Sequence, residues 1–160
     1  MERLYTPWRN AYVTTLDAVE GCFLCEKPRE EADERNLIIA RGERVYAVLN
    51  LFPYSTGHTM VAPYAHGGDL TALDPATVAE LLTCTQQVVA ALRDAYRPDA
   101  FNVGMNLGPP AGAGVPEHLH IHIVPRRHGD ADQQSNVAGG SLPEPLDRTY
   151  VRLKQALDAR

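Results

Sequence analysis

Apolar and β-branched residues recur at two spacings along the chain, and these spacings predict where strands and helices lie. Valine, isoleucine and aromatic residues gathered around turn residues are typical of β-strands. Such clusters occur at 37–40, 45–49, 58–62 and 100–107. Polar and apolar residues alternate strictly over 117–124, which predicts one more strand, ending at Pro125 because proline cannot donate to a sheet.

Two other segments have helical spacing. Asp74 followed by Pro75 is typical of a helix N-terminus, and apolar residues then recur at helical spacing over 78–96. Residues 141–144 resemble a capping box ahead of a second helix, which would carry four apolar residues on one face, Leu146, Tyr150, Leu153 and Leu157. This order of elements predicts an α+β fold, an antiparallel sheet covered by helices on one face.

The length and composition are those of a single folded domain. The chain has 160 residues, 44% of them hydrophobic and 22% charged, close to the average for globular proteins. We divide it into an N-terminal arm at 1–19, a central domain at 20–130 and a C-terminal loop and helix at 131–160. No internal repeat is present.

The charge balance argues against several kinds of partner. A net charge of −5 provides no overall basic field for a nucleic acid or an anionic membrane. No apolar run approaches the ~18 residues of a membrane span, and residues 1–10 lack the apolar stretch of a signal peptide. We therefore expect a cytoplasmic protein with neither a nucleic-acid partner nor a membrane partner. Three cysteines in a reducing compartment favour metal binding or redox chemistry over disulfides.

Three histidines lie at alternate positions in the last predicted strand. Side chains of a strand alternate between its two faces, so His118, His120 and His122 are expected to line one open surface while the residues between them enter the core. Such a row of histidines could simply be a solvated face, or all three could bind one catalytic metal. These are the two alternatives to the interpretation given next.

Residues 118–124, His-Leu-His-Ile-His-Ile-Val, resemble the signature of the histidine triad (HIT) superfamily of nucleotide hydrolases and nucleotidyl transferases. Segments 48–53, 57–63 and 102–108 resemble other parts of this superfamily in the same order. Together with the sequence Thr-Pro-Trp-Arg at 6–9, they look closest to bacterial members that act on dinucleoside polyphosphates, including diadenosine tetraphosphate phosphorylases. The resemblance implies an adenine nucleotide substrate and a homodimer or higher homo-oligomer that pairs the long helix and a sheet edge.

The resemblance assigns the chemistry to two of the histidines. It makes His120 the nucleophile that attacks an α-phosphate and forms a nucleotidyl-histidine. A free imidazole has a pKa near ~6.5, so it is mostly neutral at cytoplasmic pH and keeps one lone pair. Its other nitrogen must donate a proton, in the family to a backbone carbonyl. His122 is then placed to stabilise charge or to protonate the leaving oxygen.

The resemblance also assigns substrate contacts. Asn50 would bind ribose hydroxyls and Asn106 would lie beside the phosphates, although either amide could instead cap a turn. His58 matches a family histidine near the site. Many members carry a serine, threonine or glutamine just before the first triad histidine, but here residues 114–116 are Gly-Val-Pro. We therefore expect the phosphate contacts from backbone amides of the glycine-rich loop, at Gly112, Gly114 and Val115.

Two cysteines and two histidines form a candidate zinc site. Cys22-x-x-Cys25 alone fits zinc, redox chemistry or chance. Family members with this cysteine pair bind zinc through it, a histidine after a strand and the first triad histidine, which correspond here to His66 and His118. The resemblance therefore implies one structural Zn²⁺, and a metal-free thiol pair is the alternative.

The acceptor of the nucleotidyl group is left open by the sequence. Water gives hydrolysis, phosphate gives phosphorolysis, and another acceptor gives transfer in a biosynthetic route. Residues 126–128, Arg-Arg-His, either contribute a cationic subsite for phosphate or form a solvated loop. The alternative to an enzyme is a nucleotide-binding sensor, in which any reaction would be incidental to binding.

Overall fold

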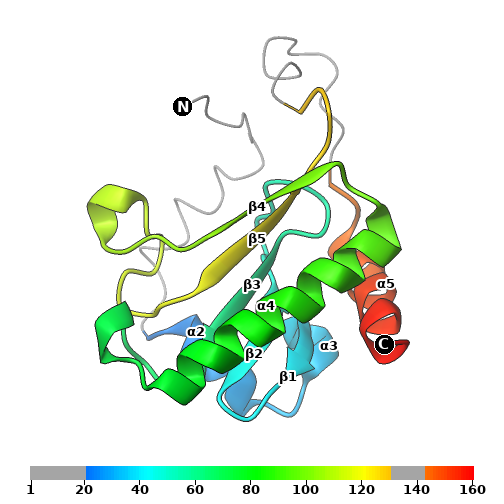
Figure 1. Cartoon of the computed structure of the whole chain (residues 1–160). Helices are drawn as coiled ribbons and strands as arrows, with labels where there is room; N and C mark the ends of the chain where they lie inside the picture. Colours follow the sequence, from blue (N-terminus) through cyan, green and yellow to red (C-terminus); the bar gives the residue numbers. More distant parts are fainter. Residues whose placement is uncertain (1–20, 131–142) are drawn as a thin grey trace.

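The computed structural model describes residues 21–130 and 143–160, and its centre is a five-stranded antiparallel sheet (Figure 1). The strands lie side by side in the order β1-β2-β3-β5-β4. Their bounds are β1 Ile38–Arg41, β2 Val45–Leu49, β3 Thr59–Pro63, β4 Ala100–Gly104 and β5 Ile121–Arg126. The predicted α+β fold with an antiparallel sheet is confirmed.

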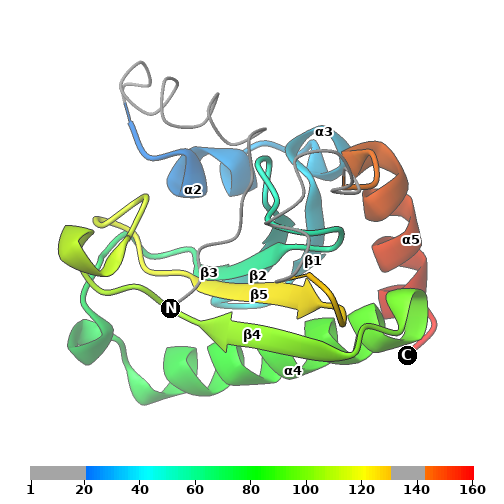
Figure 2. The ribbon, with the colours of Figure 1, turned by 90° about the horizontal axis from the view of Figure 1, so that it is seen from above.

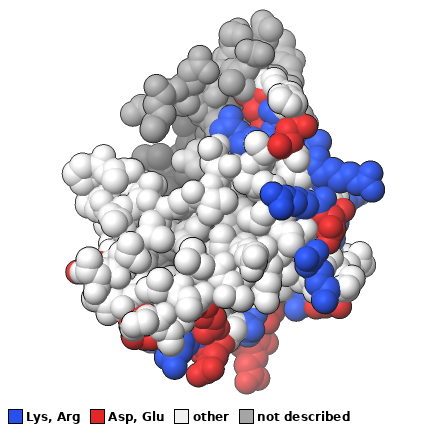
Figure 3. Space-filling model, viewed as in Figure 1, with Lys and Arg blue, Asp and Glu red and all other residues white. Residues whose placement is uncertain are grey.

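Two helices cover one face of this sheet, α4 (Pro75–Tyr96) and α5 (Leu146–Asp158), as Figures 1 and 2 show. Asp74 caps α4 as predicted, since its carboxylate accepts a hydrogen bond from the Thr77 amide. The core beneath α4 and α5 contains Ala47, Leu49, Val61, Leu81, Val88, Leu92, Ile121, Ile123 and Leu153. Figure 3 shows charged side chains mainly at the margins of this side of the molecule. Within the described residues, none of the helices is long and apolar enough to cross a bilayer.

Short helical segments cover part of the opposite face. They are α2 (Phe23–Glu26), η3 (Lys27–Arg29) and α3 (Asp33–Asn36), none of which the sequence pattern predicts. Leu24 of α2 is buried against residues of β1, β2 and β3, namely Ile38, Tyr46, Val48, Met60 and Ala62. The Tyr46 hydroxyl donates a 2.6 Å hydrogen bond to the Leu24 carbonyl, which fixes α2 on the sheet. The prediction that helices cover only one face of the sheet is therefore incomplete.

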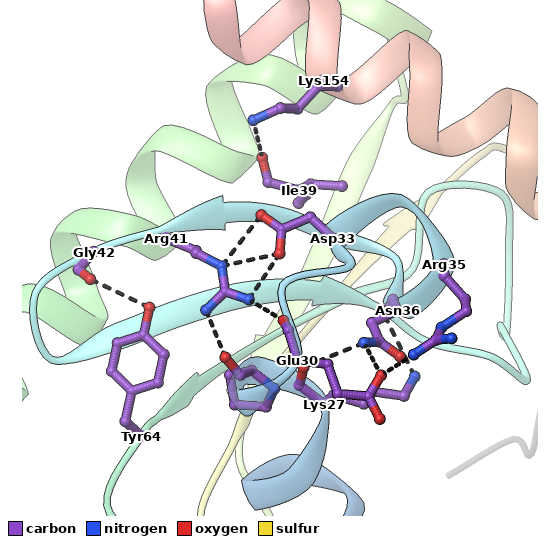
Figure 4. Close-up of polar contacts among 11 residues, drawn as sticks. Lys27, Glu30, Asp33, Arg35, Asn36, Ile39, Arg41, Gly42, Tyr64 and Lys154 are labelled. Atoms are coloured by element: carbon purple, nitrogen blue, oxygen red, sulfur yellow. Dashed lines mark hydrogen bonds and ion pairs between the residues drawn. The ribbon is translucent and has the colours of Figure 1, made fainter.

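Polar contacts fasten the segment between α2 and β1 (Figure 4). The Arg41 guanidinium donates to the Asp33 carboxylate and to the carbonyls of Pro28 and Glu30. The Asn36 amide donates to the Lys27 carbonyl. Residues 27–36 are thereby held against the β1 edge of the sheet.

The last strand differs from its prediction at both ends. Residues 117–120 lie outside β5, and the strand continues through Pro125 to Arg126. The pairing of β3 with β5 ends at Ile123, so Pro125 removes no hydrogen bond between these two strands. On that side the Ser55 hydroxyl donates to the Pro125 carbonyl instead. The fourth strand is also shorter than predicted, because β4 ends at Gly104.

The C-terminal helix is confirmed, but its predicted cap is wrong. Pro145 is the N-cap of α5 and provides no side-chain cap. The Glu144 carboxylate instead accepts hydrogen bonds from the Tyr96 hydroxyl at 2.6 Å and the Thr149 hydroxyl at 3.1 Å. Ser141 and Leu142 of the proposed capping box, the rest of the loop at 131–140 and the arm at 1–19 lie outside the described residues.

Glu144 joins α5 to α4, so its removal is expected to lower stability. Glu144→Ala leaves two hydroxyl donors without their shared acceptor, and we expect the free energy of unfolding to fall by about 1–3 kcal/mol. Thermal or urea denaturation measures this change. Glu43→Ala is the matched control, because the Glu43 side chain is almost fully exposed. Equal stability of both variants would contradict the role given to Glu144.

Candidate active site and metal cluster

A cavity of about 960 Å³ opens on the face of the sheet that α4 and α5 leave uncovered. One end is mainly apolar and the other is formed by β4 and the glycine-rich loop that follows it. Its lining includes Phe23, Lys27, Asn50, Leu51, Phe52, Met60, Asn102, Asn106, Gly112, Gly114, Val115, Glu117, His120, His122 and Val124. Seven of the residues predicted for catalysis and substrate binding thus surround one cavity.

His120 is held in a single tautomer. Its Nδ1 atom lies 2.8 Å from the His118 carbonyl oxygen, which can only accept, so Nδ1 carries the proton and donates. The Nε2 atom therefore keeps its lone pair, on a ring that lines the cavity. Burial lowers the pKa of His120, which favours the neutral ring. The structure supplies the backbone carbonyl that a histidine nucleophile requires.

His122 is oriented through His58. The Tyr54 backbone amide donates to His58 Nδ1 at 3.0 Å, so the proton of His58 lies on Nε2. That Nε2 atom is 2.9 Å from His122 Nδ1 and donates to it. A neutral His122 then carries its own proton on Nε2. The cavity wall thus combines a lone pair on His120 Nε2 with a hydrogen-bond donor on His122.

His58 does not have the position expected of a substrate-binding residue. Its side chain is only 1% exposed and is absent from the cavity lining, because it lies behind His122. The geometry gives it an orienting role. The amide of Tyr54, which sequence reasoning did not single out, fixes its tautomer.

The two predicted asparagines line the cavity while also making local contacts. Asn50 Oδ1 accepts a 2.9 Å hydrogen bond from the Phe52 amide, the turn-capping arrangement that was the alternative to ribose binding. Asn106 donates through Nδ2 to the Gly112 carbonyl at 3.3 Å, and its Oδ1 atom accepts no hydrogen bond from the residues that the structure describes.

The glycine-rich loop uses two of its amides internally. Gly108 and Gly112 have positive φ angles of 82° and 86°, a conformation that favours glycine. The amides of Gly112 and Ala113 donate to the carbonyls of Pro109 and Gly108. In the described part of the chain, no acceptor binds the amides of Gly114 and Val115. These two N–H groups are the ones left for a phosphate.

Four side chains from distant parts of the sequence meet beside α2. The sulfurs of Cys22 and Cys25 each lie 3.3 Å from His118 Nδ1, and Cys25 Sγ lies 3.3 Å from His66 Nδ1. All four candidate ligand atoms lie within 4.8 Å of one another. Tetrahedral zinc with usual bond lengths separates sulfur and nitrogen ligands by about 3.6 Å. The arrangement therefore fits a zinc ion.

The chemistry of the cluster also suits a cation. His118 Nε2 donates to the Pro63 carbonyl at 2.8 Å, which directs Nδ1 toward the two sulfurs, as in metal sites where a backbone carbonyl orients the ligand. Burial lowers the pKa of His118, which favours the neutral ring. Burial also raises the pKa of the Cys22 thiol, because an isolated thiolate is costly there. A divalent metal would offset that cost.

The expectation that three histidines share one open surface is wrong. His118 is 0% exposed and points at the cysteines, so only His120 and His122 line the cavity. The His118 amide donates to the Val115 carbonyl in a turn, and the strand begins only at Ile121. Strand alternation therefore does not apply at residue 118. This geometry argues against one metal site formed by all three triad histidines.

Residues 126–128 do not line the cavity. Arg126 donates to Asn102 Oδ1, Arg127 donates to the Tyr96 carbonyl, and the His128 side chain is almost fully exposed. Sequence reasoning instead missed the apolar end of the cavity, formed by Phe23, Leu51, Phe52 and Met60. Phe23 lies between the two cysteines in the sequence, and this position was the available signal that it lies near the site.

The comparisons with known proteins agree with this geometry. The HIT domain family matches residues 31–129. A relative from Mycobacterium tuberculosis named AP-4-A phosphorylase is 39% identical over 96% of this chain and 82% of its own length. A bifunctional bis(5'-adenosyl)-triphosphatase/adenylylsulfatase from Arabidopsis thaliana is 32% identical over 71% of this chain and 59% of its own.

Solved structures show the same fold. A Zn-bound histidine triad family protein from Mycobacterium smegmatis superposes with a TM-score of 0.70 at 28% identity, covering 87% of this chain and 94% of that one. A hypothetical histidine triad nucleotide-binding protein from Sulfolobus tokodaii superposes with a TM-score of 0.71 at 25% identity. The match covers 86% of this chain and 93% of that one. The chain belongs to the histidine triad family, which confirms the resemblance seen in the sequence.

Proposed function

We propose that this protein is an enzyme that cleaves dinucleoside polyphosphates, such as diadenosine tetraphosphate, at an α-phosphate through a nucleotidyl-His120 intermediate. The observation that carries the proposal is the hydrogen bond from His120 Nδ1 to the His118 carbonyl, which leaves the Nε2 lone pair for attack in the cavity. The 39% identical relative is named for a phosphorylase activity, which favours phosphate over water as the acceptor.

The first step is in-line attack of His120 Nε2 on the α-phosphorus. A P–N bond forms, the P–O bond to the rest of the substrate breaks, and a nucleoside triphosphate leaves from a tetraphosphate. A terminal phosphate oxygen is stable as an anion, so it needs a hydrogen bond rather than a proton, and His122 Nε2–H provides one. The positive charge that develops on His120 is stabilised by its bond to the His118 carbonyl.

The second step restores the enzyme. An oxygen of phosphate attacks the nucleotidyl group, the P–N bond breaks, and a nucleoside diphosphate leaves. Water in the same position gives a nucleoside monophosphate. We expect the amides of Gly114 and Val115 and the Asn106 side chain to contact the transferred phosphate, because they line the cavity with hydrogen-bonding groups to spare.

The products of diadenosine tetraphosphate distinguish these outcomes. Incubation with phosphate should give ATP and ADP, whereas hydrolysis gives ATP and AMP, and chromatography separates the three nucleotides. Labelled phosphate should appear in ADP alone. Absence of any cleavage, with or without phosphate, would remove this substrate class and favour a specialised acceptor or a nucleotide-binding sensor.

The same proposal includes one structural Zn²⁺ held by Cys22, Cys25, His66 and His118. Four protein ligands close the coordination sphere, which is typical of structural rather than catalytic zinc. Such a site would tie α2 to the turn that carries the His118 carbonyl, and hence would steady His120. Free cysteines are typical of a reducing compartment, and on this ground we propose a cytoplasmic location.

We also propose a homodimer formed through β4 and α4. β4 is an edge strand, and Val103 on it is half exposed. Leu82 of α4 is 61% exposed, and no residue from 81 to 92 is charged. Arg93 lies over the Phe101 ring, which places this side of α4 next to β4. Figure 3 shows few charges on this side of the molecule. An apolar edge of this kind suits a self-complementary interface.

Leu82→Arg is expected to dissociate the dimer, because it places a charge in an apolar interface. Sedimentation equilibrium should then give the mass of one 17.6 kDa chain in place of twice that mass. Val151→Arg is the matched control, since Val151 is 48% exposed on α5. A monomeric parent protein, or a dimer unaffected by Leu82→Arg, would contradict this interface.

A further inference from the structure

One of the two lysines of the chain lies in the cavity wall. Lys27 belongs to η3, directly after α2, and lines the cavity beside Phe23 and Leu51. The other lysine, Lys154, belongs to α5 on the opposite face of the sheet. Figure 4 shows the two side chains on different elements, each reaching toward a backbone carbonyl. Lys27 and Glu117 are the charged residues of the described cavity lining.

The Lys27 ammonium group has few partners. Its nearest acceptor is the Asn36 carbonyl, 3.5 Å from Nζ and at the limit of a hydrogen bond, and its Nζ lies 5.7 Å from the centre of the Phe23 ring. Among the described residues, no carboxylate forms an ion pair with it. An ammonium has three N–H donors, so at least two remain for a ligand.

The position of Lys27 indicates which part of the ligand it meets. The aliphatic and aromatic side chains of Phe23, Leu51 and Met60 make this end of the cavity apolar, which suits a planar nucleobase rather than a phosphate. The amides expected to bind phosphate belong to the loop between β4 and β5, whereas Lys27 reaches the carbonyl of Asn36 in α3, which packs on β1 at the opposite edge of the sheet.

We propose that Lys27 is a specificity-determining residue that donates hydrogen bonds to the nucleobase and favours guanine over adenine at this end of the cavity. Guanine presents O6 and N7 as adjacent acceptors, the pair that lysine recognises in nucleic acids. Adenine presents an amino group in place of O6, and this donor faces the ammonium unfavourably. The inference rests on the proposed function only for the orientation of the nucleotide in the cavity.

The test compares diguanosine and diadenosine tetraphosphate as substrates. Lys27→Met keeps the length and apolar stem of the side chain but removes the charge and the donors, and we expect the ratio of kcat/KM for guanine over adenine to fall about tenfold or more. Lys27→Arg should retain most of the preference, because it retains a cationic donor. Lys154→Met is the matched control and should leave the ratio unchanged. An equal loss on both substrates, or an unchanged ratio, would overturn the proposal.

Binding measurements separate this inference from the proposed reaction. Calorimetric titration with GMP and AMP requires no turnover, and the parent protein should bind GMP more tightly than Lys27→Met does, with little change for AMP. If neither tetraphosphate is cleaved but GMP binding depends on Lys27, the proposed reaction fails and the inference stands. If cleavage occurs and neither the ratio nor GMP binding responds to Lys27→Met, the inference alone fails. Absence of GMP binding to the parent protein would also overturn it.

Discussion

Replacing His120 with alanine is expected to lower kcat/KM for a dinucleoside polyphosphate by roughly 10⁴-fold or more while leaving the protein folded. Among the three triad histidines, the geometry supports His120 as the nucleophile, since His118 faces the cysteines and His122 accepts a hydrogen bond from His58 at Nδ1, which places its own proton on Nε2. Binding of the substrate depends on other groups, so the loss should appear in kcat more than in KM. Steady-state kinetics measure the loss of activity, and circular dichroism shows whether the variant stays folded.

A matched histidine variant and a trapping experiment make this prediction specific. His128→Ala removes an almost fully exposed imidazole and should keep near-normal activity. The parent enzyme quenched during turnover should carry the mass of one nucleotidyl group, bound through an acid-labile P–N bond to the peptide that contains His120. Residual activity of His120→Ala within tenfold of the parent, or an adduct on another residue, would contradict the assignment.

Loss of the metal is expected to produce the largest effect on stability. Cys22→Ser removes one of four ligands, and a structural zinc stabilises the fold by several kcal/mol because the unfolded chain lacks the site. We expect the melting temperature of the variant to fall by about 10 °C or more. A strong chelator should lower the melting temperature of the parent protein to a similar value. Atomic absorption should find one zinc per chain in the parent and less in the variant.

The control uses the remaining cysteine. Cys84 is buried in α4 within the main core, where burial raises the pKa of its thiol to about 11, so it acts as an apolar side chain. Cys84→Ala should retain one zinc per chain and lose only the stability that a small cavity costs. Identical melting of the parent protein with and without chelator would exclude the structural zinc.

Most of the fold could be predicted from local patterns. The Asp74-Pro75 start of α4 and the strands at 45–49 and 59–63 follow from side-chain spacing and turn chemistry, which are properties of neighbouring residues. The ends of β5 could not be predicted in this way. Whether Pro125 ends a strand depends on where its neighbouring strands lie, and here β3 pairs only as far as Ile123 whereas Phe101 of β4 pairs with Pro125.

The candidate site was predicted by resemblance more than by spacing. Motif matches alone brought together the four proposed zinc ligands and the pair His120 and His122. Strand alternation, used alone, placed His118 on the wrong surface, because a turn precedes β5. No pattern in the sequence distinguished Lys27 from the other charged residues of 26–35, and only the placement of η3 beside α2 and α3 makes it part of the cavity.

By itself, the sequence determined the five strands and the two long helices, the α+β class and the residue types that nucleotidyl transfer requires, because these depend on short-range spacing and on intrinsic side-chain chemistry. Only the tertiary structure decided which nitrogen of each histidine carries the proton. That choice depends on the acceptor or donor that the fold brings to the other nitrogen, the His118 carbonyl for His120 and the His58 ring for His122. These partners come from backbone geometry and from a loop 64 residues away along the chain, which no local pattern specifies.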